Sequence, residues 1–243
     1  MRAQPSAAPI EAVIFDKDGV LVDFERTWTP VIRAAALDFA NGDKGRAHEL
    51  LRMAGYDEEK NGFLPGSIWA SGTNAALARL WGADGDEEIH ARFLETMALQ
   101  CAAARPLPIV PPALMRERLG ALSARGMRLA LATNDTTLSA QKTAEAFGLT
   151  GHFDFICGFE AVDEPKPGPG PVYAFAEKCG VEPERIAVIG DNPCDGEMAR
   201  AGGCALFVGV LSGNSGDAEL APLAAHVAGD VLEAADFILR GAR

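Results

Sequence analysis

The stretch Ala12–Asp23, with the sequence AVIFDKDGVLVD, decides the fold of this chain. It begins with four residues typical of a buried strand and places two acids, Asp16 and Asp18, directly after them. Burying two neighbouring carboxylates is unfavourable unless a cation or hydrogen-bond donors compensate for lost hydration and mutual repulsion. The stretch therefore predicts a strand whose end carries a charged site, and the rest of the chain should supply the compensating groups.

Apolar, strand-like runs alternate with helical patterns through most of the chain. Strands that are apolar throughout are buried on both faces, as in a parallel sheet covered by helices on either side. We therefore expect an α/β fold with a doubly wound parallel sheet. The expected strands cover residues 12–16, 127–134, 153–157, 185–191 and 204–210, and the expected helices cover 111–125, 136–147, 171–179, 194–201 and 230–239.

Residues from about 24 to 108 break this alternation, because they contain helical patterns but no convincing strand. One helix is expected over 29–40, with Thr29 as N-cap and Pro30 at the first helical position. Two more are expected over 72–81, opened by Ser71 or Thr73, and over 86–104.

The prolines of residues 104–112 mark the return from this helical stretch to the sheet. We therefore expect a core domain made of residues 10–23 and 106–243. A helical cap domain of residues 24–105 is expected between its two parts.

Polar residues follow the expected strands at their carboxyl ends, where open α/β sheets bind ligands. Three carboxylates with a nearby carbonyl suit Mg²⁺, and a lysine with a hydroxyl suits a phosphoryl group. Gly19 lets the backbone turn sharply, so that amides after Asp16 can point at phosphate oxygens. The sequence thus predicts a metal site beside a phosphoryl site. Its members are Asp16, Asp18, Thr133, Asn134, Lys166, Asp191 and Asp195.

Four motifs occur in order along the chain: DKDGV at 16–20, LATND at 131–135, EPKPGPGP at 164–171 and GDNPCD at 190–195. Together they resemble the motifs of the haloacid dehalogenase-like hydrolase superfamily, on the branch of phosphoglycolate phosphatases. The resemblance implies a Rossmann-like core with a small α-helical cap inserted after the first strand. It also implies a Mg²⁺-dependent phosphatase that acts on a small phosphorylated metabolite, such as phosphoglycolate or a sugar phosphate.

The resemblance also implies a role for each residue of the catalytic set. Asp16 would be the nucleophile that forms an aspartyl-phosphate, and Asp18 would be the general acid and base. Thr133 and Lys166 would bind the transferred phosphoryl group, to which Asn134 would lend an amide.

The implied Mg²⁺ ligands are Asp16, the backbone carbonyl of Asp18, and Asp191. For Asp195 two roles stay open, since it either binds the metal through water or holds Lys166 in place.

This sequence departs from the family pattern at two places. Lys17 stands between the two acids, where the closest phosphatases have an apolar residue. It either touches the substrate or is solvated, and of these two we expect it to be solvated and dispensable. Asn192-Pro193 stands where a small hydroxyl residue is common, which removes the hydrogen bond expected from such a residue.

Three other functions fit parts of the same pattern. A phosphomutase of the same fold would keep all four motifs. A dehalogenase would also attack with Asp16, but it would not need an acid and base such as Asp18. A non-enzymatic receiver-like module, phosphorylated on Asp16, shares the acid cluster with a threonine and a lysine at strand ends, although it has no use for a cap.

Composition narrows the possible partners and the location. The 22 basic and 34 acidic residues give a net charge of −12 without any basic block, which argues against nucleic acid or an anionic membrane as partner. The five cysteines form no C-x-x-C pair, and no apolar run approaches the length of a membrane span. We expect a cytoplasmic protein.

Substrate selection is expected to lie in the cap. We expect its three tryptophans, Trp28, Trp69 and Trp81, to be core residues. The loop-like stretch of residues 63–74 is expected to border the substrate, and Arg33 or Arg79 to meet a substrate carboxylate.

Overall fold

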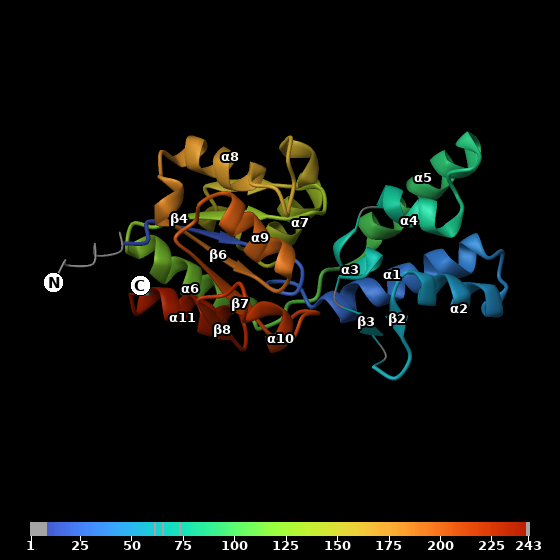
Figure 1. The fold of residues 1–243 in the computed structure, drawn as a ribbon, viewed down its shortest axis with the longest axis horizontal. Coiled ribbons are helices and arrows are strands. Elements are labelled where there is room, and N and C mark those ends of the chain that lie inside the picture. The colour runs from blue at the N-terminus through green and yellow to red at the C-terminus, as the bar shows by residue number, and fades with distance from the viewer. Residues whose placement is uncertain (1–8, 61, 65, 73, 242–243) are drawn as a thin grey trace.

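The computed structural model describes residues 9–60, 62–64, 66–72 and 74–241, and it shows an α/β fold built on a six-stranded sheet (Figure 1). All neighbouring strands of this sheet are parallel, in the order β5-β4-β1-β6-β7-β8. This confirms the expected doubly wound sheet and adds β8, which the sequence did not predict. The strands are β1 (Ala12–Phe15), β4 (Arg128–Ala132), β5 (Phe155–Cys157), β6 (Ile186–Gly190), β7 (Leu206–Val210) and β8 (His226–Ala228).

Alternate residues of β1 face opposite sides of the sheet, and each side is covered by its own helices. Val13 and Phe15 pack into a cluster with α6, α7 and α11, whereas Ala12 and Ile14 pack with α8 and α9. Because both faces are buried, β1 has to be apolar throughout. The covering helices are α6 (Pro112–Ala124), α7 (Thr137–Ala146), α8 (Gly170–Cys179), α9 (Pro193–Ala201) and α11 (Val231–Leu239). The four-residue helix α10 (Asp217–Leu220) precedes β8.

The chain reverses its direction across the sheet next to β1. It runs outward from β1 to β4 and β5 and then crosses back to β6, which pairs with the other side of β1. The carboxyl ends of β1 and β6 therefore flank the topological switch point, where open α/β sheets bind ligands. Asp16 follows β1 and Asp191 follows β6, so the fold brings these two acids to one place.

A helical insertion lies between β1 and α6 and packs around a core of its own, which includes Ile32, Leu50, Leu77 and Met97. Figure 1 shows it as a second lobe beside the sheet. Its helices are α1 (Phe24–Phe39), α2 (Lys44–Met53), α3 (Ile68–Ser71), α4 (Asn74–Trp81) and α5 (Glu87–Ala103). Among the described residues, no helix combines the length and the hydropathy of a membrane span.

The first helix of the insertion begins earlier than expected. Asp23 caps it by accepting a hydrogen bond from the backbone N–H of Arg26 at 3.0 Å. Thr29 is therefore not the N-cap; its hydroxyl donates to Glu25 one turn earlier, and Pro30 lies inside the helix. An acid placed directly after the β1 loop is as good a cap as threonine, and it lets the helix start at once.

Two further features of the insertion differ from expectation. The structure contains α2 and a hairpin of β2 (Tyr56–Asp57) with β3 (Gly62–Phe63), whereas the sequence predicted no strand in this interval. Strands of two residues are too short to show a period in sequence. Of the two expected N-caps for residues 72–81, Thr73 lies outside the described residues and Ser71 belongs to α3.

Candidate active site

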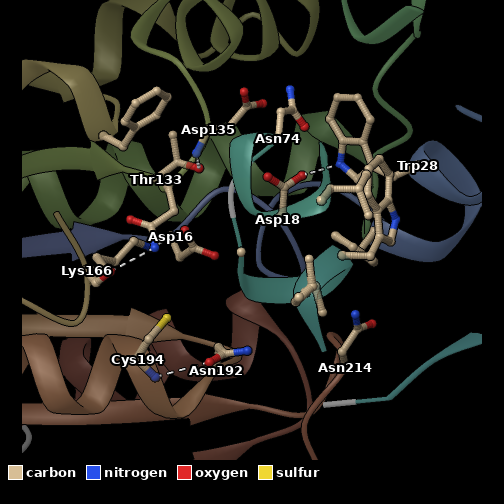
Figure 2. Close-up of a pocket in the computed structure, with 18 of the residues that line it drawn as sticks. Asp16, Asp18, Trp28, Asn74, Thr133, Asp135, Lys166, Asn192, Cys194 and Asn214 are labelled. Carbon is tan, nitrogen blue, oxygen red and sulfur yellow. Dashed lines mark hydrogen bonds and ion pairs between the residues drawn. The ribbon is translucent and has the colours of Figure 1, made fainter. Parts of the chain in front are cut away.

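The carboxyl ends of the central strands hold most of the expected site residues, which come together around one lysine (Figure 2). The Nζ atom of Lys166 lies 2.5 Å from Oδ1 of Asp16 and 2.7 Å from Oδ1 of Asp195. Lys166 comes from the loop before α8 and Asp195 from the first turn of α9. The structure thus turns the loop lysine inward, where it is 6% exposed.

Asp191 completes a group of buried carboxylates with Asp16 and Asp195. Each offers one oxygen, and these oxygens all lie within 4.8 Å of one another. Oxygen ligands at this spacing are the donor set that a hard divalent cation prefers. The side chain of Asp18 is not part of the group.

Two glycines allow the Asp191 carboxylate to lie where it does. A Cβ atom at Gly19 or at Gly213 would overlap this carboxylate, and Gly19 has a φ of +79°, which side chains rarely adopt. The backbone N–H of Asn214 donates to Oδ2 of Asp191 at 3.0 Å. The N–H of Gly19 donates to the Val22 carbonyl. Gly19 therefore serves the site by letting the backbone approach Asp191.

Burial controls the protonation of this group. It raises the pKa of Asp16 to about 6, against the opposing effect of Lys166. The pKa of Asp191 is raised well above its ordinary value by burial and by the charges of Asp16 and Asp195. Burial would lower the pKa of Lys166, but Asp16 and Asp195 outweigh it and the pKa is raised. A bound cation would favour the ionised carboxylates and so lower their pKa values. The residues present therefore fit a metal.

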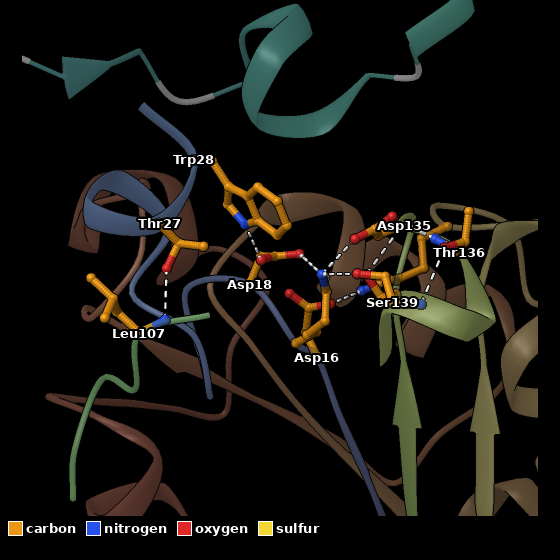
Figure 3. Close-up of polar contacts among 11 residues, drawn as sticks. Asp16, Asp18, Thr27, Trp28, Leu107, Asp135, Thr136 and Ser139 are labelled. Atoms are coloured by element: carbon orange, nitrogen blue, oxygen red, sulfur yellow. Dashed lines mark hydrogen bonds and ion pairs between the residues drawn. The ribbon is translucent and has the colours of Figure 1, made fainter. Parts of the chain in front are cut away.

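Asp18 is held by a second set of contacts (Figure 3). Trp28 Nε1 donates to its Oδ1 at 2.5 Å, and the Nζ of Lys17 lies 3.0 Å from its Oδ2. Lys17 also donates to Asp135 at 2.6 Å and to Ser139 at 3.2 Å. The pKa of Asp18 is raised by burial, which Lys17 partly offsets. These contacts fix the orientation of the Asp18 carboxyl group.

The expectation of a solvated Lys17 is wrong. Its side chain is fully buried, and its ammonium lies 4.9 Å from the centre of the Trp28 ring. Burial would lower its pKa, but Asp18 and Asp135 outweigh this and raise the pKa to about 12. The sequence contained one sign that Lys17 is buried. Asp135 follows Asn134 at the end of the neighbouring strand, and an acid there can serve as the ion-pair partner of Lys17.

Thr133 and Asn134 follow β4 and connect two motifs. Thr133 is buried, and its hydroxyl accepts a hydrogen bond from the N–H of Asp135 at 3.0 Å. The side-chain amide of Asn134 donates to the backbone carbonyl of Lys166 at 2.9 Å. This contact holds the loop that carries the lysine. Helix α7 is capped by Thr136.

Asn192 takes a structural role at the start of α9. Its side chain accepts from the N–H of Cys194 at 3.1 Å, while its own N–H donates to Oδ2 of Asp195 at 3.2 Å. This reciprocal pair is a capping box. Asp195 therefore uses one oxygen for the helix and the other for Lys166, which is the contact that one of its two expected roles requires.

A cavity of about 430 Å³ lies between the strand ends and the insertion. The core wall includes Asp16, Asp18, Thr133, Lys166, Asp191 and Asp195. The insertion wall includes Phe24, Ile68, Trp69, Ala75, Leu77 and Leu94. From the loop-like stretch that was expected to border the substrate, Ile68, Trp69 and Asn74 line the cavity.

All three tryptophans of the insertion pack in hydrophobic clusters, as expected, and Trp81 donates to the Leu50 carbonyl. Trp28 and Trp69 also line the cavity. The expectation for the two arginines is wrong. Arg33 and Arg79 are exposed and do not line the cavity. Their places on α1 and α4 point them away from it, which a sequence period alone does not reveal.

The loop after β7 is a part of the site that sequence reasoning missed. Ser212 donates to the Gly19 carbonyl at 2.7 Å, and Asn214 binds Asp191 and lines the cavity. The signal was the stretch SGNSG at residues 212–216, which follows a strand just as the other motifs do.

A comparison with protein families agrees with this geometry. The model of the haloacid dehalogenase-like hydrolase family matches residues 10–203. The chain belongs to this family. It is therefore an enzyme, a hydrolase, and the interpretation as a receiver-like module is wrong.

Known relatives of this hydrolase cover most of its length. It is 33% identical over 203 residues to a phosphoglycolate phosphatase of Rhodospirillum rubrum, which is 82% of this chain and 78% of the relative. It is 30% identical over 198 residues to a phosphoglycolate phosphatase of Chromobacterium violaceum, 81% and 83% of the two chains. The crystal structure of a predicted phosphoglycolate phosphatase from Haemophilus somnus 129pt superposes with a TM-score of 0.71 at 23% identity, covering 96% and 99%. The last likeness supports the fold.

Proposed function

We propose that this hydrolase is a Mg²⁺-dependent phosphatase that hydrolyses a small phosphate monoester through an aspartyl-phosphate on Asp16. The observation that carries the proposal is the junction of Asp16, Lys166 and Asp195 at the end of β1, with Asp191 beside it. This junction offers a nucleophile, a cation for phosphoryl oxygens and oxygen ligands for a metal in one buried space. The activity named for the relatives supports the reaction class.

Asp16 is the nucleophile of the proposed mechanism. With a pKa of about 6 it is mostly ionised at neutral pH, and Lys166 holds one of its oxygens. An Asp16 oxygen attacks phosphorus, the bond to the leaving oxygen breaks, and that oxygen departs as an alcohol after taking a proton. Water then attacks phosphorus, the bond to Asp16 breaks, and inorganic phosphate leaves.

Asp18 is the proposed general acid of the first step and general base of the second. The raised pKa of this carboxyl group favours the protonated form that the first step needs. Asp18 gives its proton to the leaving oxygen and takes one from the attacking water, so each turnover restores it. Trp28 and Lys17 act by orienting it.

Lys166 and Thr133 are the proposed ligands of the transferred phosphoryl group. Asn134 acts mainly by holding Lys166 through its backbone carbonyl, and Gly19 by the turn it allows.

Asp16, the backbone carbonyl of Asp18 and Asp191 would hold Mg²⁺. When bound there, this ion would neutralise charge on the phosphoryl oxygens.

We also propose that residues 10–23 and 106–243 form the catalytic domain and residues 24–105 a cap. The insertion contributes one wall of the cavity, which supports a role in excluding water during the reaction. The two connecting segments are tied together, because the N–H of Leu107 donates to the Thr27 hydroxyl and its carbonyl accepts from Asp23 (Figure 3).

Phosphate release from p-nitrophenyl phosphate tests the reaction class. We expect release that depends on Mg²⁺ and stops when EDTA is added. Asp16→Asn keeps the shape of the side chain but removes its charge, so it should abolish turnover while the melting temperature is maintained. Turnover that survives in this variant would contradict the role of Asp16.

A phosphomutase of the same fold is the alternative that the geometry leaves. Incubation with glucose 1-phosphate separates the two activities, because the phosphatase releases inorganic phosphate and the mutase returns an isomeric hexose phosphate. Accumulation of the isomer without free phosphate would replace the present proposal.

A further inference from the structure

The two walls of the cavity differ in chemistry. The core wall is built mostly of charged and polar side chains, whereas the side chains of the insertion wall are mostly hydrocarbon. Among the described residues that line the insertion wall, neutral polar side-chain groups occur on Trp28, Trp69, Asn74 and Cys101. The phosphoryl group of a substrate has to lie against the core wall, next to Lys166 and Asp16. The leaving group of the substrate then lies against the insertion wall, and the side chains there determine which leaving groups are accepted.

None of the described basic side chains of the insertion lines the cavity. Arg33 is engaged with Tyr56, over whose ring its guanidinium lies, and Arg79 is exposed on α4. The insertion residues outside the described ranges are Asn61, Pro65 and Thr73, and none of these is basic. The insertion thus brings no counter-ion for an anionic leaving group.

The two lysines near the cavity are already neutralised. Lys166 is paired with Asp16 and Asp195, and Lys17 is paired with Asp18 and Asp135. Acids outnumber lysines around the cavity, so a second negative group on the substrate would be repelled. It would also lose its hydration without gaining a partner, which is costly for a charged group.

The neutral polar groups of the insertion are few. The Nε1 atom of Trp69 is buried and has no hydrogen-bond partner among the described residues. Asn74 of α4 also lines the cavity. These groups can serve one or two neutral oxygens or nitrogens. They are too few for the ring of hydroxyls on a sugar.

We propose that this enzyme selects phosphate monoesters whose leaving group is uncharged and largely apolar or aromatic, and that it discriminates against phosphoglycolate. The inference rests on the proposed phosphatase function and names its substrate class. The cavity volume of about 430 Å³ lies within the range of about 300 to 1,000 Å³ typical of sites for drug-sized ligands. It therefore has room for an aromatic ring beside the phosphoryl group.

A panel of three monoesters tests the proposal on the unmodified protein with Mg²⁺. Benzyl phosphate carries an apolar ring, 2-hydroxyethyl phosphate a small neutral group, and phosphoglycolate a carboxylate in nearly the same shape as the second. We expect kcat/KM to fall in this order, with benzyl phosphate favoured over phosphoglycolate by about tenfold or more. Equal or faster hydrolysis of phosphoglycolate would overturn the inference.

Ala75 of α4 offers a matched pair of variants, because it is half-buried in the insertion wall and small. Ala75→Arg adds a cation there, and Ala75→Met adds similar length without charge. The Arg variant should raise the ratio of kcat/KM for phosphoglycolate over 2-hydroxyethyl phosphate several-fold, and the Met variant should not. The same ratio in both variants would contradict the claim that the missing counter-ion sets the preference.

Binding measurements separate failure of this inference from failure of the phosphatase proposal. Calorimetry on the Asp16→Asn protein with Mg²⁺ compares benzyl phosphate with phosphoglycolate without turnover. Tighter binding of benzyl phosphate, with no phosphate released by the unmodified protein from any ester, would refute the phosphatase proposal and support the inferred ligand class. Rapid hydrolysis with tighter binding of phosphoglycolate would support the phosphatase proposal and refute the inferred ligand class.

Discussion

The core wall and the insertion wall of the cavity are held in place by different kinds of interaction. Lys166, Asp16 and Asp195 are fixed by ion pairs at the ends of buried strands and of α9. Leu77 and Leu94 of the insertion wall pack instead into the hydrophobic core of the insertion. The ion pairs hold in place the groups that carry out the reaction, whereas the apolar packing sets the shape of the space that the leaving group occupies. Changes in the core wall should therefore affect every substrate alike, and changes in the insertion wall should alter the ratios between substrates.

The largest effect is expected for Lys166→Met. It removes the cation next to the phosphoryl group and leaves Asp16 and Asp195 without their partner, so kcat should fall by about a thousandfold. The loss should be similar for benzyl phosphate and 2-hydroxyethyl phosphate in steady-state assays. Lys142→Met, on the exposed surface of α7, is the matched control and should retain full activity. A loss of activity confined to one substrate would contradict the claim that changes in the core wall affect every substrate alike.

Lys17→Met should have the next largest effect. It leaves Asp18 and Asp135 without a counter-ion, and disrupting a buried ion pair costs about 2 to 3 kcal/mol of stability when the partners are partly exposed. We also expect the pKa of Asp18 to rise further, since Lys17 lowers it in the intact protein. The alkaline limb of the pH profile of kcat/KM, where Asp18 loses the proton that the first step needs, should then move to higher pH by about one unit.

The double variant Lys17→Met with Asp135→Asn is the control for charge. It removes the buried acid along with the lysine, so part of the lost stability should return in thermal melts. An unshifted pH profile in Lys17→Met would show that Lys17 does not act through Asp18.

Trp28→Phe tests the hydrogen bond from the insertion to the catalytic acid. It removes the N–H that donates to Asp18 and keeps a ring over Lys17, so kcat should fall by about tenfold. Trp81→Phe removes a similar donor inside the insertion core and should lower the melting temperature without changing kcat. Equal kcat losses in the two variants would indicate general loosening of the insertion.

The smallest effect is a shift in melting temperature with pH and Mg²⁺. The pKa of Asp16 rises from 3.8 to about 6 in the folded state. Its contribution to stability is therefore full below pH 3.8 and is lost as the pH rises through about 6. Mg²⁺ should compensate above that pH, raising the melting temperature by about 5 to 10 °C at saturation.

At pH 4.5 the same Mg²⁺ concentration should have little effect, because Asp16 and Asp191 are then protonated. Asp191→Asn is the matched variant, and Mg²⁺ should stabilise it much less at neutral pH. A Mg²⁺ effect that does not depend on pH would contradict the proposed ligands.

Sequence predicted the core far better than the insertion, for physical reasons. The strands β1 and β6 are apolar throughout, and β4 is apolar after Arg128. The polar residues after these strands lie at one sheet edge because the strands are parallel. Asp16, Asp191 and Lys166 could thus be assembled from local patterns alone. The burial of Lys17 could not be predicted in this way, because it depends on Asp135 after the neighbouring strand β4 and on Trp28 from α1.

The insertion was predicted less well for the same reason, because its structure depends on contacts between residues that are distant in sequence. Its hairpin of β2 and β3 has strands of two residues, which leave no period to detect. The side of α4 that faces the cavity is set by packing of Leu77 against residues distant in sequence. Arg79 looked available in the sequence, yet its position on the helix turns it to the solvent.

Trapping the covalent intermediate tests the role of Asp16 most directly. In Asp18→Asn, p-nitrophenyl phosphate can still phosphorylate the enzyme, because its leaving group needs no proton, while hydrolysis of the intermediate lacks its general base. Borohydride reduction of the mixture, followed by peptide mass spectrometry, should convert residue 16 to homoserine only when substrate and Mg²⁺ are both present. Release of p-nitrophenol with residue 16 unchanged, or reduction at another acid, would contradict the account.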